Sequence, residues 1–288
     1  MPAKVYLVSY ATPKFAAAQE RLCKTGLRYG GIDGCDRWDG ARIRETEFFR
    51  RSRDILSEPR GAGFWAWKPF IIWQCLSTVA PGDWVIYCDS GYGRGNYFCR
   101  SVHPLVGWVR DHLNGMMPGV YVPQFGPNRR WTRRDCFVAM DCDGAEYWEH
   151  CQIQAGVSIW QHRRSALDLL EQWVHFCSRR EVVSDDPNVL GLPNFPEFVD
   201  HRHDQSVLTN LCLKFGISAL GSPGSRVENA HNINSLVDYV EQRFLPQRLA
   251  RARRMITAGT PRWARRHLRR AGSLTLAKLW PGHRHLLE

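Results

Sequence analysis

The sequence predicts an α/β protein with a mostly parallel central sheet flanked by helices. Segments typical of strands alternate with segments typical of helices through most of the chain, which is the pattern of a sheet whose strands are joined by helices. A hydrophobic content of 44% with twelve Trp excludes a disordered or fibrous chain. The 288 residues are enough for one large domain. We expect this domain over residues 1–245, followed by a basic helical tail over residues 246–288.

The predicted strands are short and apolar. Residues 5–10 form the first of them. Residues 84–88 form a continuous apolar run, Trp-Val-Ile-Tyr-Cys, which is typical of a strand buried on both faces of a sheet. Further strand candidates are residues 120–122, 136–140 and 157–160.

The predicted helices carry apolar side chains at helical spacing. One helix follows the first strand, with Phe15, Ala18 and Leu22 on one face, and another starts at Pro69 and ends before Pro81. Three more apolar stripes lie within residues 105–113, 167–177 and 207–215. Residues 184–200 are rich in Pro, Gly, Asn and Asp and predict a long loop.

Cysteine usage and hydropathy predict a cytoplasmic protein. The ten Cys stand singly at wide spacings without a CxxC pair, so we expect reduced, mostly buried thiols and neither a zinc site nor a disulfide framework. The sequence has no run of about 18 or more apolar residues, so it predicts no membrane-spanning helix. The N-terminus has a first strand in place of the apolar region and cleavage site of a signal peptide.

The positive charge is concentrated in the tail. The chain has a net charge of +11, from 39 Lys and Arg against 28 Asp and Glu. Residues 248–288 contain ten Arg, one Lys and one Glu, a net of +10, which leaves +1 for the rest. Binding of nucleic acid through the Arg-rich tail is therefore a weak functional hypothesis, weaker than the two described at the end of this section. We expect no specific nucleic-acid partner.

Several common catalytic motifs are absent. The sequence has no GxxxxGK[ST] phosphate loop and no GxGxxG dinucleotide fingerprint after the first strand. It also lacks GxSxG and HExxH, the commonest hydrolase and metalloprotease signals.

The first candidate block is the strand that ends at Asp89. A carboxylate at the carboxyl end of a sheet strand faces the crevice in which α/β proteins bind ligands, and Mg²⁺ and Mn²⁺ prefer such oxygen ligands. Asp89 capping the next turn is the alternative. Asp141-Cys142-Asp143 is a literal DxD motif and a second metal candidate, although Gly144 after it is typical of a turn.

The second and third candidate blocks flank predicted helices. Residues 60–69 combine glycines, two Trp as stacking faces and Lys68 for a phosphate, although the Trp side chains also suit a core. Residues 200–206 contain two Asp, two His and one Arg at a helix start, where Asp204 suits an N-cap. The pair His201 and His203 alone does not supply a zinc site.

The three blocks in this order resemble a group of bacterial nucleotide-sugar glycosyltransferases. Their patterns are GxGFWxWKP at residues 61–69, YxDxG at residues 87–91 and HRxDQS at residues 201–206, with a Gln-x-Gly-Val strand at residues 154–157. The resemblance covers residues 5–233 and implies a GT-A fold and surface-polysaccharide synthesis. The group is distantly similar to retaining galactosyl- and mannosyltransferases that use a divalent cation.

The resemblance implies a role for each matching residue. Asp89 would hold Mn²⁺ or Mg²⁺ against the donor diphosphate, with His231 as a late ligand, while Gly91 stands where the family has a second Asp. Catalytic roles fall on Asp204, Gln205 and Gln154. Donor-binding roles fall on Trp65, Trp67, Lys68, Tyr87, Asp89, Arg133, His201 and Arg202.

The function that the resemblance implies is transfer of a sugar from a nucleotide-sugar donor to a glycan or glycolipid acceptor. The resemblance favours a hexosyltransferase that retains the anomeric configuration of the sugar. A divalent cation and basic side chains would offset the charge that develops on the leaving diphosphate. A GT-A-like protein that binds a sugar nucleotide or polysaccharide without turnover is the main alternative, because the second Asp is missing. We expect the tail, with interleaved Trp and Leu, to hold the protein peripherally on the anionic inner face of the cytoplasmic membrane.

Overall fold

The computed structural model describes residues 2–91 and 96–244. The chain divides into two units, Met1–Val240 and Glu241–Glu288, and the elements described below belong to the first. The basic tail expected over residues 246–288 lies outside the described residues.

The centre of the first unit is a five-stranded sheet. Its order is β2 (Gly34–Asp39), β1 (Val5–Ala11), β3 (Trp84–Cys88), β7 (Val157–Gln161) and β4 (Met116–Met117). β1 pairs in parallel with both β2 and β3, whereas β7 pairs antiparallel with both β3 and β4. Four strands therefore point the same way, which confirms a mixed α/β fold with a mostly parallel sheet.

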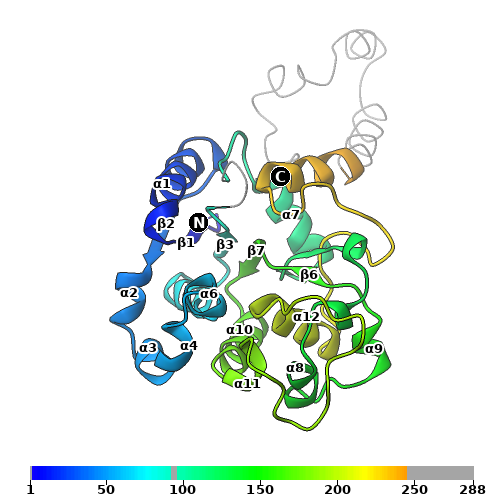
Figure 1. The fold of residues 1–288 in the computed structure, drawn as a ribbon. Helices are drawn as coiled ribbons and strands as arrows, with labels where there is room; N and C mark the ends of the chain where they lie inside the picture. The colour runs from blue at the N-terminus through cyan, green and yellow to red at the C-terminus, as the bar shows by residue number, and fades with distance from the viewer. Residues whose placement is uncertain (1, 92–95, 245–288) are drawn as a thin grey trace, which may run out of the picture. The chain divides into compact units, whose positions relative to one another are not determined.

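Helices cover both faces of this sheet (Figure 1). α1 (Ala16–Thr25) and α7 (His103–His112) pack on one face, and α6 (Trp67–Thr78) packs on the other, backed by α10 (Arg164–Cys177). All five residues of β3 are buried, as the continuous apolar run predicts. The main hydrophobic core lies between the sheet and the α6–α10 layer.

A smaller sheet and further helices complete the described part. β5 (Val120–Tyr121) pairs antiparallel with β6 (Ile153–Gln154), and α12 (Asp204–Lys214) packs against β6. The remaining elements are η1 (Pro13–Phe15), η2 (Gly26–Gly30), α2 (Gly40–Arg44), α3 (Glu47–Arg51), α4 (Arg53–Leu56), α5 (Gly61–Phe64), η3 (Pro123–Phe125), η4 (Asn128–Arg130), α8 (Arg134–Ala139), α9 (Ala145–Trp148) and α11 (Arg180–Val183). Residues 233–240 are also helical. No helix in residues 2–91 or 96–244 is long and apolar enough to span a bilayer.

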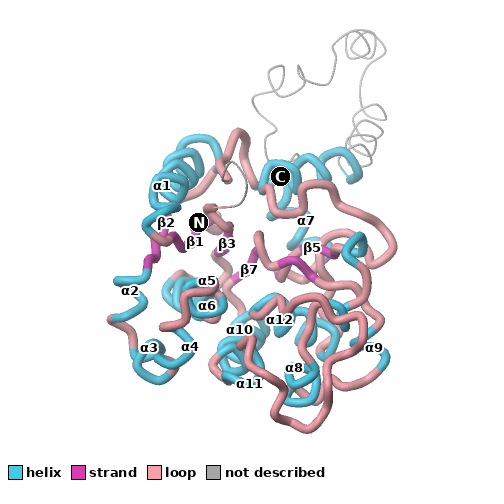
Figure 2. The backbone as a smooth tube through the Cα atoms, viewed as in Figure 1, coloured by secondary structure: helices cyan, strands magenta, loops and turns pink. Residues whose placement is uncertain are grey.

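Of two sequence-based assignments, one is wrong and the other is confirmed. The strand expected at residues 136–140 is wrong, because residues 136–139 belong to helix α8 and Met140 caps it. A short apolar run has no periodicity that separates a buried strand from a buried helix. The long loop expected at residues 184–200 is confirmed, since no helix or strand interrupts the described chain between α11 and α12 (Figure 2).

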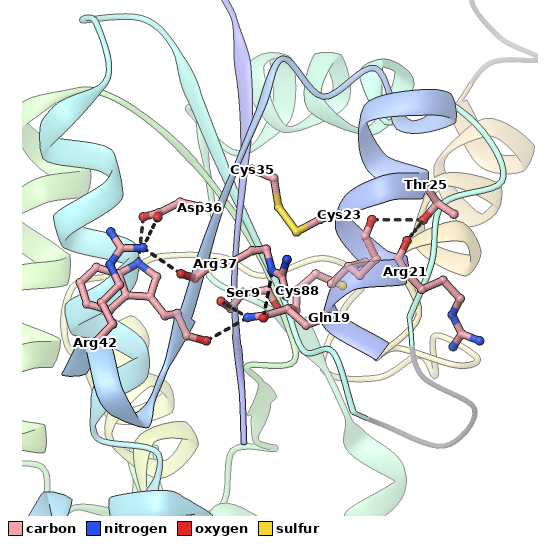
Figure 3. The surroundings of a disulfide bond; sticks show 12 residues. Ser9, Gln19, Arg21, Cys23, Thr25, Cys35, Asp36, Arg37, Arg42 and Cys88 are labelled. Carbon is pink, nitrogen blue, oxygen red and sulfur yellow. Dashed lines mark hydrogen bonds and ion pairs between the residues drawn. A yellow bond between two sulfur atoms is a disulfide. The ribbon is translucent and has the colours of Figure 1, made fainter. Parts of the chain in front are cut away.

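The expectation of reduced cysteines is wrong for one pair. Cys23 in α1 and Cys35 in β2 form a disulfide that ties the helix to the edge strand beside it (Figure 3). Their Cα atoms lie 5.9 Å apart, within the range a disulfide spans. The other eight cysteines are free; seven are buried and Cys99 is exposed. The sequence separation of 12 holds no signal for this pairing, which depends on how α1 returns the chain to β2.

Candidate functional site

The candidate site lies at the point in the sheet where successive strand connections leave β1 toward opposite sides. From β1 the chain passes through α1 to β2 on one side, and then through α6 to β3 on the other side of β1. The carboxyl ends of β1 and β3 are neighbours, with Val8 opposite Tyr87. Open α/β sheets bind ligands in the crevice at such a switch point, and Asp89 follows β3 directly at this place.

Hydrogen bonds from both neighbouring strands fix the backbone around Asp89. Ser9 Oγ donates to the Cys88 carbonyl at 2.8 Å, and Ser90 Oγ donates to the Tyr10 carbonyl at 2.8 Å. The Asp89 amide donates to the Gly156 carbonyl at 2.9 Å. These bonds hold the backbone on both sides of the Asp89 side chain.

Lys68 joins Asp89 to Asp204 in a buried ion-pair network. Lys68 Nζ lies 2.9 Å from Asp204 Oδ2 and 3.8 Å from Asp89 Oδ1. The Lys68 and Asp204 side chains are each 5% exposed, whereas the Asp89 side chain is 31% exposed. The contact with Asp204 is an ion pair whose geometry is not that of an aligned hydrogen bond. One residue from each of the three sequence blocks therefore meets at this point.

Burial and charge oppose each other within this network. Burial raises the pKa of Asp204 to about 6, and the nearby Lys68 ammonium limits the rise. Burial also opposes the charge on Lys68, but the carboxylates of Asp204 and Asp89 outweigh it, so the pKa of Lys68 is raised. Two carboxylates against one ammonium give this network a formal charge of −1.

Tyr87 supports Asp89 from inside the sheet. Its hydroxyl donates to Asp89 Oδ1, and its ring lies 5.3 Å from the Lys68 ammonium. Burial, followed by the charge of Asp89, raises the pKa of Tyr87 well above its ordinary value. Because Tyr87 is fully buried, it orients the carboxylate and has no surface for a donor molecule.

Gly156 lies close to the side chains of Asp89, His231 and Gln154. A Cβ at this position would lie 3.2 Å from Asp89 Oδ2 and 3.6 Å from the His231 Cβ. Gln154 Nε2 is 3.8 Å from the same point, and the buried Gln154 Oε1 has no hydrogen-bond partner. Asn96 Nδ2 donates to the carbonyls of both Asp89 and His231, which holds the two segments together.

The residues around Asp89 fit a cation that shares its ligands with a substrate. The described part of the chain holds no cluster of three or more His, Cys, Asp or Glu side chains suited to a metal ion. Mg²⁺ commonly binds through one or two carboxylates together with substrate phosphates and water. Burial lowers the pKa of His231, against the effect of the Asp89 charge, which favours the neutral ring that metal binding requires.

Phe15 fills the place next to Gly91. A Cβ on Gly91 would lie 2.6 Å from the Phe15 ring, closer than real Cβ contacts allow. A second carboxylate at Gly91 is therefore excluded while Phe15 occupies this position. The literal DxD at residues 141–143 is engaged elsewhere: Asp141 pairs with Lys214 and Asp143 pairs with Arg134.

Three predicted donor-binding residues have structural contacts instead. Trp67 is buried, stacks on Tyr10 at 3.9 Å, and donates its Nε1–H to the Gly61 carbonyl. His201 is 1% exposed, and the pKa of this His is lowered well below its ordinary value by burial. Arg133 is 3% exposed and donates to the carbonyls of Ser184 and Pro187. These side chains shape the surroundings of the site but leave no surface for a donor.

The other predicted residues lie nearer the protein surface. Trp65 is half-buried beside His203, and the Arg202 guanidinium lies 4.6 Å from the Trp131 ring centre. Gln205 accepts a hydrogen bond from the Ala155 amide at 3.4 Å and donates to Gln152 Oε1. The Gln205 amide therefore connects the start of α12 to the segment that carries Gly156.

Sequence reasoning missed several residues that build the site. Ser9, Ser90, Asn96 and Gly156 act through hydrogen bonds or through the room they leave, as described above, and Trp173 Nε1 donates to the Asp204 carbonyl at 2.8 Å. Only Gly156 had a signal, as part of the Gln-x-Gly-Val strand. The others are ordinary residue types without a motif.

Comparisons with known proteins do not assign a family. No family model and no curated protein matches the chain. Among solved structures, the apo form of the bifunctional glycosyltransferase WbbM is similar over 73% of this chain, with a TM-score of 0.40 and 10% identity. The chain spans 38% of that structure's length. A likeness of this size does not establish a shared family or activity.

Proposed function

We propose that the chain is a GT-A-type glycosyltransferase that transfers a sugar from a nucleotide-sugar donor to a glycan or glycolipid acceptor. The observation that carries the proposal is the meeting of Asp89, Lys68 and Asp204 at the switch point of the sheet. These residues come from the three blocks on which the sequence resemblance rests. Their position at the carboxyl ends of β1 and β3 is where a nucleotide is expected to bind.

Asp89 and His231 are the residues that would hold a divalent cation, Mn²⁺ or Mg²⁺. When bound, the cation offsets negative charge on the donor diphosphate. This role suits the local net charge of −1, because a diphosphate would otherwise be repelled. Mn²⁺ is therefore expected to bind more tightly in the presence of a nucleoside diphosphate than alone, which calorimetry measures directly.

Lys68 and Asp204 have complementary tasks in the proposed transfer. Lys68 Nζ lies near the carboxylates of both Asp204 and Asp89 and offsets part of their negative charge. Asp204, whose side chain is only 5% exposed, would act by holding Lys68 in place and balancing its charge. Gln154, whose Oε1 has no hydrogen-bond partner, is placed to bind a sugar hydroxyl beside Gly156.

The test is nucleoside diphosphate release from a panel of uridine, guanosine and thymidine diphosphate sugars with Mn²⁺. We expect Asp89→Asn to slow release about 100-fold or more, as the loss of an electrostatic group at a reacting centre does. Asp141→Asn is the matched control, because the Asp141 side chain is fully exposed and part of the literal DxD motif. Equal rates for wild type and Asp89→Asn with every donor would contradict the proposal.

A non-catalytic sugar-nucleotide-binding protein is the second candidate. The Phe15 ring beside Gly91 favours it, because no second carboxylate fits there. Calorimetry separates the two functions: binding of a nucleotide sugar without any release of diphosphate from a wide acceptor panel would support the binding protein.

The basic tail is proposed to place the protein peripherally at the inner membrane face, next to acceptors for surface polysaccharides. Its charge of +10 with interleaved Trp and Leu supports an interfacial anchor. Truncation before Pro246 is expected to reduce sedimentation with phosphatidylglycerol vesicles and to preserve turnover of a soluble acceptor. Loss of turnover with unchanged vesicle binding would contradict this role.

A further inference from the structure

Residues 61–65 form a left-handed turn directly before α6. All five residues have positive φ angles: 59° at Gly61, 52° at Ala62, 100° at Gly63, 52° at Phe64 and 57° at Trp65. Gly tolerates this conformation, but Ala, Phe and Trp do not adopt it readily. Such strained backbone persists only where its surroundings hold it in place. The turn ends three residues before Lys68, whose amide donates to the Trp65 carbonyl at 2.9 Å.

A second residue with a strained backbone, His203, directly precedes Asp204, the ion-pair partner of Lys68. His203 has φ 48° and ψ −117° and precedes Asp204, the first residue of α12. This conformation matches the first central position of a type II′ turn, where Gly is usual. A bulky residue there indicates that its side chain makes contacts that outweigh the backbone strain.

The two strained segments pack against each other through the His203 ring. The ring is 2% exposed, stacks on Phe64 at 5.1 Å between ring centres, and lies 5.5 Å from the Trp65 ring. Its Nδ1–H donates to the Val183 carbonyl at 2.8 Å, which fixes its orientation from α11. Arg60, at the start of the left-handed turn, forms ion pairs with both Asp185 and Asp200.

We propose that His203 is a positioning residue: its ring packs against the left-handed turn and thereby holds Lys68 next to Asp204. The ring prevents the left-handed turn from relaxing, and the turn sets where α6 begins and therefore where Lys68 points. The same residue sets the start of α12 and therefore the place of Asp204. The inference rests on the proposed function only in that this ion pair belongs to the active site.

The position of Lys68 can be measured without any substrate. Reductive methylation with formaldehyde and a borane, followed by mass spectrometry, reports how accessible each lysine amine is. Lys68 is 5% exposed and paired, whereas the Lys24 side chain is 73% exposed and provides an internal reference. All variants are compared at a temperature at which each is fully folded by circular dichroism.

Two substitutions at residue 203 separate positioning from stability. His203→Gly removes the ring and accepts the backbone conformation, so we expect Lys68 to be methylated about tenfold faster than in wild type through local opening. His203→Phe keeps a ring against Phe64 but loses the bond to Val183, so methylation should stay within about twofold of wild type despite a lower thermal midpoint. Asp141→Gly, which relieves a positive φ just after α8, is the control and should not change the methylation of Lys68.

Methylation of Lys68 at the wild-type rate in His203→Gly would overturn the inference. So would rates that follow the thermal midpoints of the variants and not the presence of a ring. The result is independent of turnover: if wild-type protein releases no diphosphate but the methylation pattern holds, the proposed function fails while the positioning role stands.

Discussion

Lys68 Nζ lies 2.9 Å from Asp204 Oδ2, and both side chains are almost completely removed from solvent. The first precedes β3, and the second opens α12 more than one hundred residues later. A buried ion pair of this kind is weak evidence for stability, because desolvation of both charges offsets their attraction. Its presence beside Asp89 at the switch point is better explained by chemistry.

Replacing the pair with apolar residues should separate stability from function. Lys68→Met or Asp204→Leu alone leaves one buried charge without its partner, and each should lower the free energy of unfolding by about 3–5 kcal/mol. The double variant removes both charges and should regain most of that loss. Urea denaturation measures the stability. Diphosphate release should be absent in all three variants, and a double variant no more stable than the single ones would argue against the coupling.

The close approach of Gly156 to Asp89 predicts that one added methyl group weakens cation binding. Gly156→Ala places a Cβ 3.2 Å from Asp89 Oδ2, so we expect the affinity for Mn²⁺ with uridine diphosphate to fall about tenfold. Isothermal titration measures it. Gly107→Ala is the matched control: it lies within α7 with no atom within 4 Å of the added Cβ. It should leave affinity unchanged and stabilise the protein by about 0.5–1 kcal/mol. Equal affinities in both variants would place the cation elsewhere.

The raised pKa of Asp204 predicts a dependence of stability on pH. Burial raises this pKa from 3.8 to about 6, so the folded state binds the proton more tightly than the unfolded state. The resulting stabilisation is complete below about pH 3.8 and is lost as the pH rises through 6. Relative to Asp204→Asn, wild type should lose roughly 3 kcal/mol of unfolding free energy between pH 3.5 and 7. Denaturation curves of both proteins at several pH values that run parallel would contradict the shift.

The disulfide between α1 and β2 should contribute to stability. It closes a short loop with a sequence separation of 12, for which the loss of unfolded-state entropy amounts to about 2–3 kcal/mol. Cys23→Ser should therefore lower the free energy of unfolding by this amount, as should reduction of wild type with dithiothreitol. Cys99→Ser, which replaces the exposed free thiol, is the control and should have no effect. A wild-type protein insensitive to reductant would show that the two thiols are not joined in solution.

The sequence by itself determined the class of the fold and the place of one candidate site residue, Asp89. Alternating apolar runs and helical stripes were sufficient for the α/β class, for β3 and for the helices that carry the blocks, because these patterns record which faces are buried. Asp89 was identified because a polar residue directly after a buried strand must lie at the edge of the sheet. The loop at residues 184–200 was recognisable from its turn-forming composition.

Only the tertiary structure decided which residues work together. Trp67 and Trp65 are two positions apart, yet one enters the core and the other stays partly exposed, because a left-handed turn precedes α6. Residues 136–139 form a helix and Cys23 pairs with Cys35 because of packing that local propensity does not encode. The pairing of Lys68 with Asp204 depends on how α6, α10 and α12 pack around one core. Contacts between distant segments are set by the whole arrangement of elements, and each local sequence is compatible with many such arrangements.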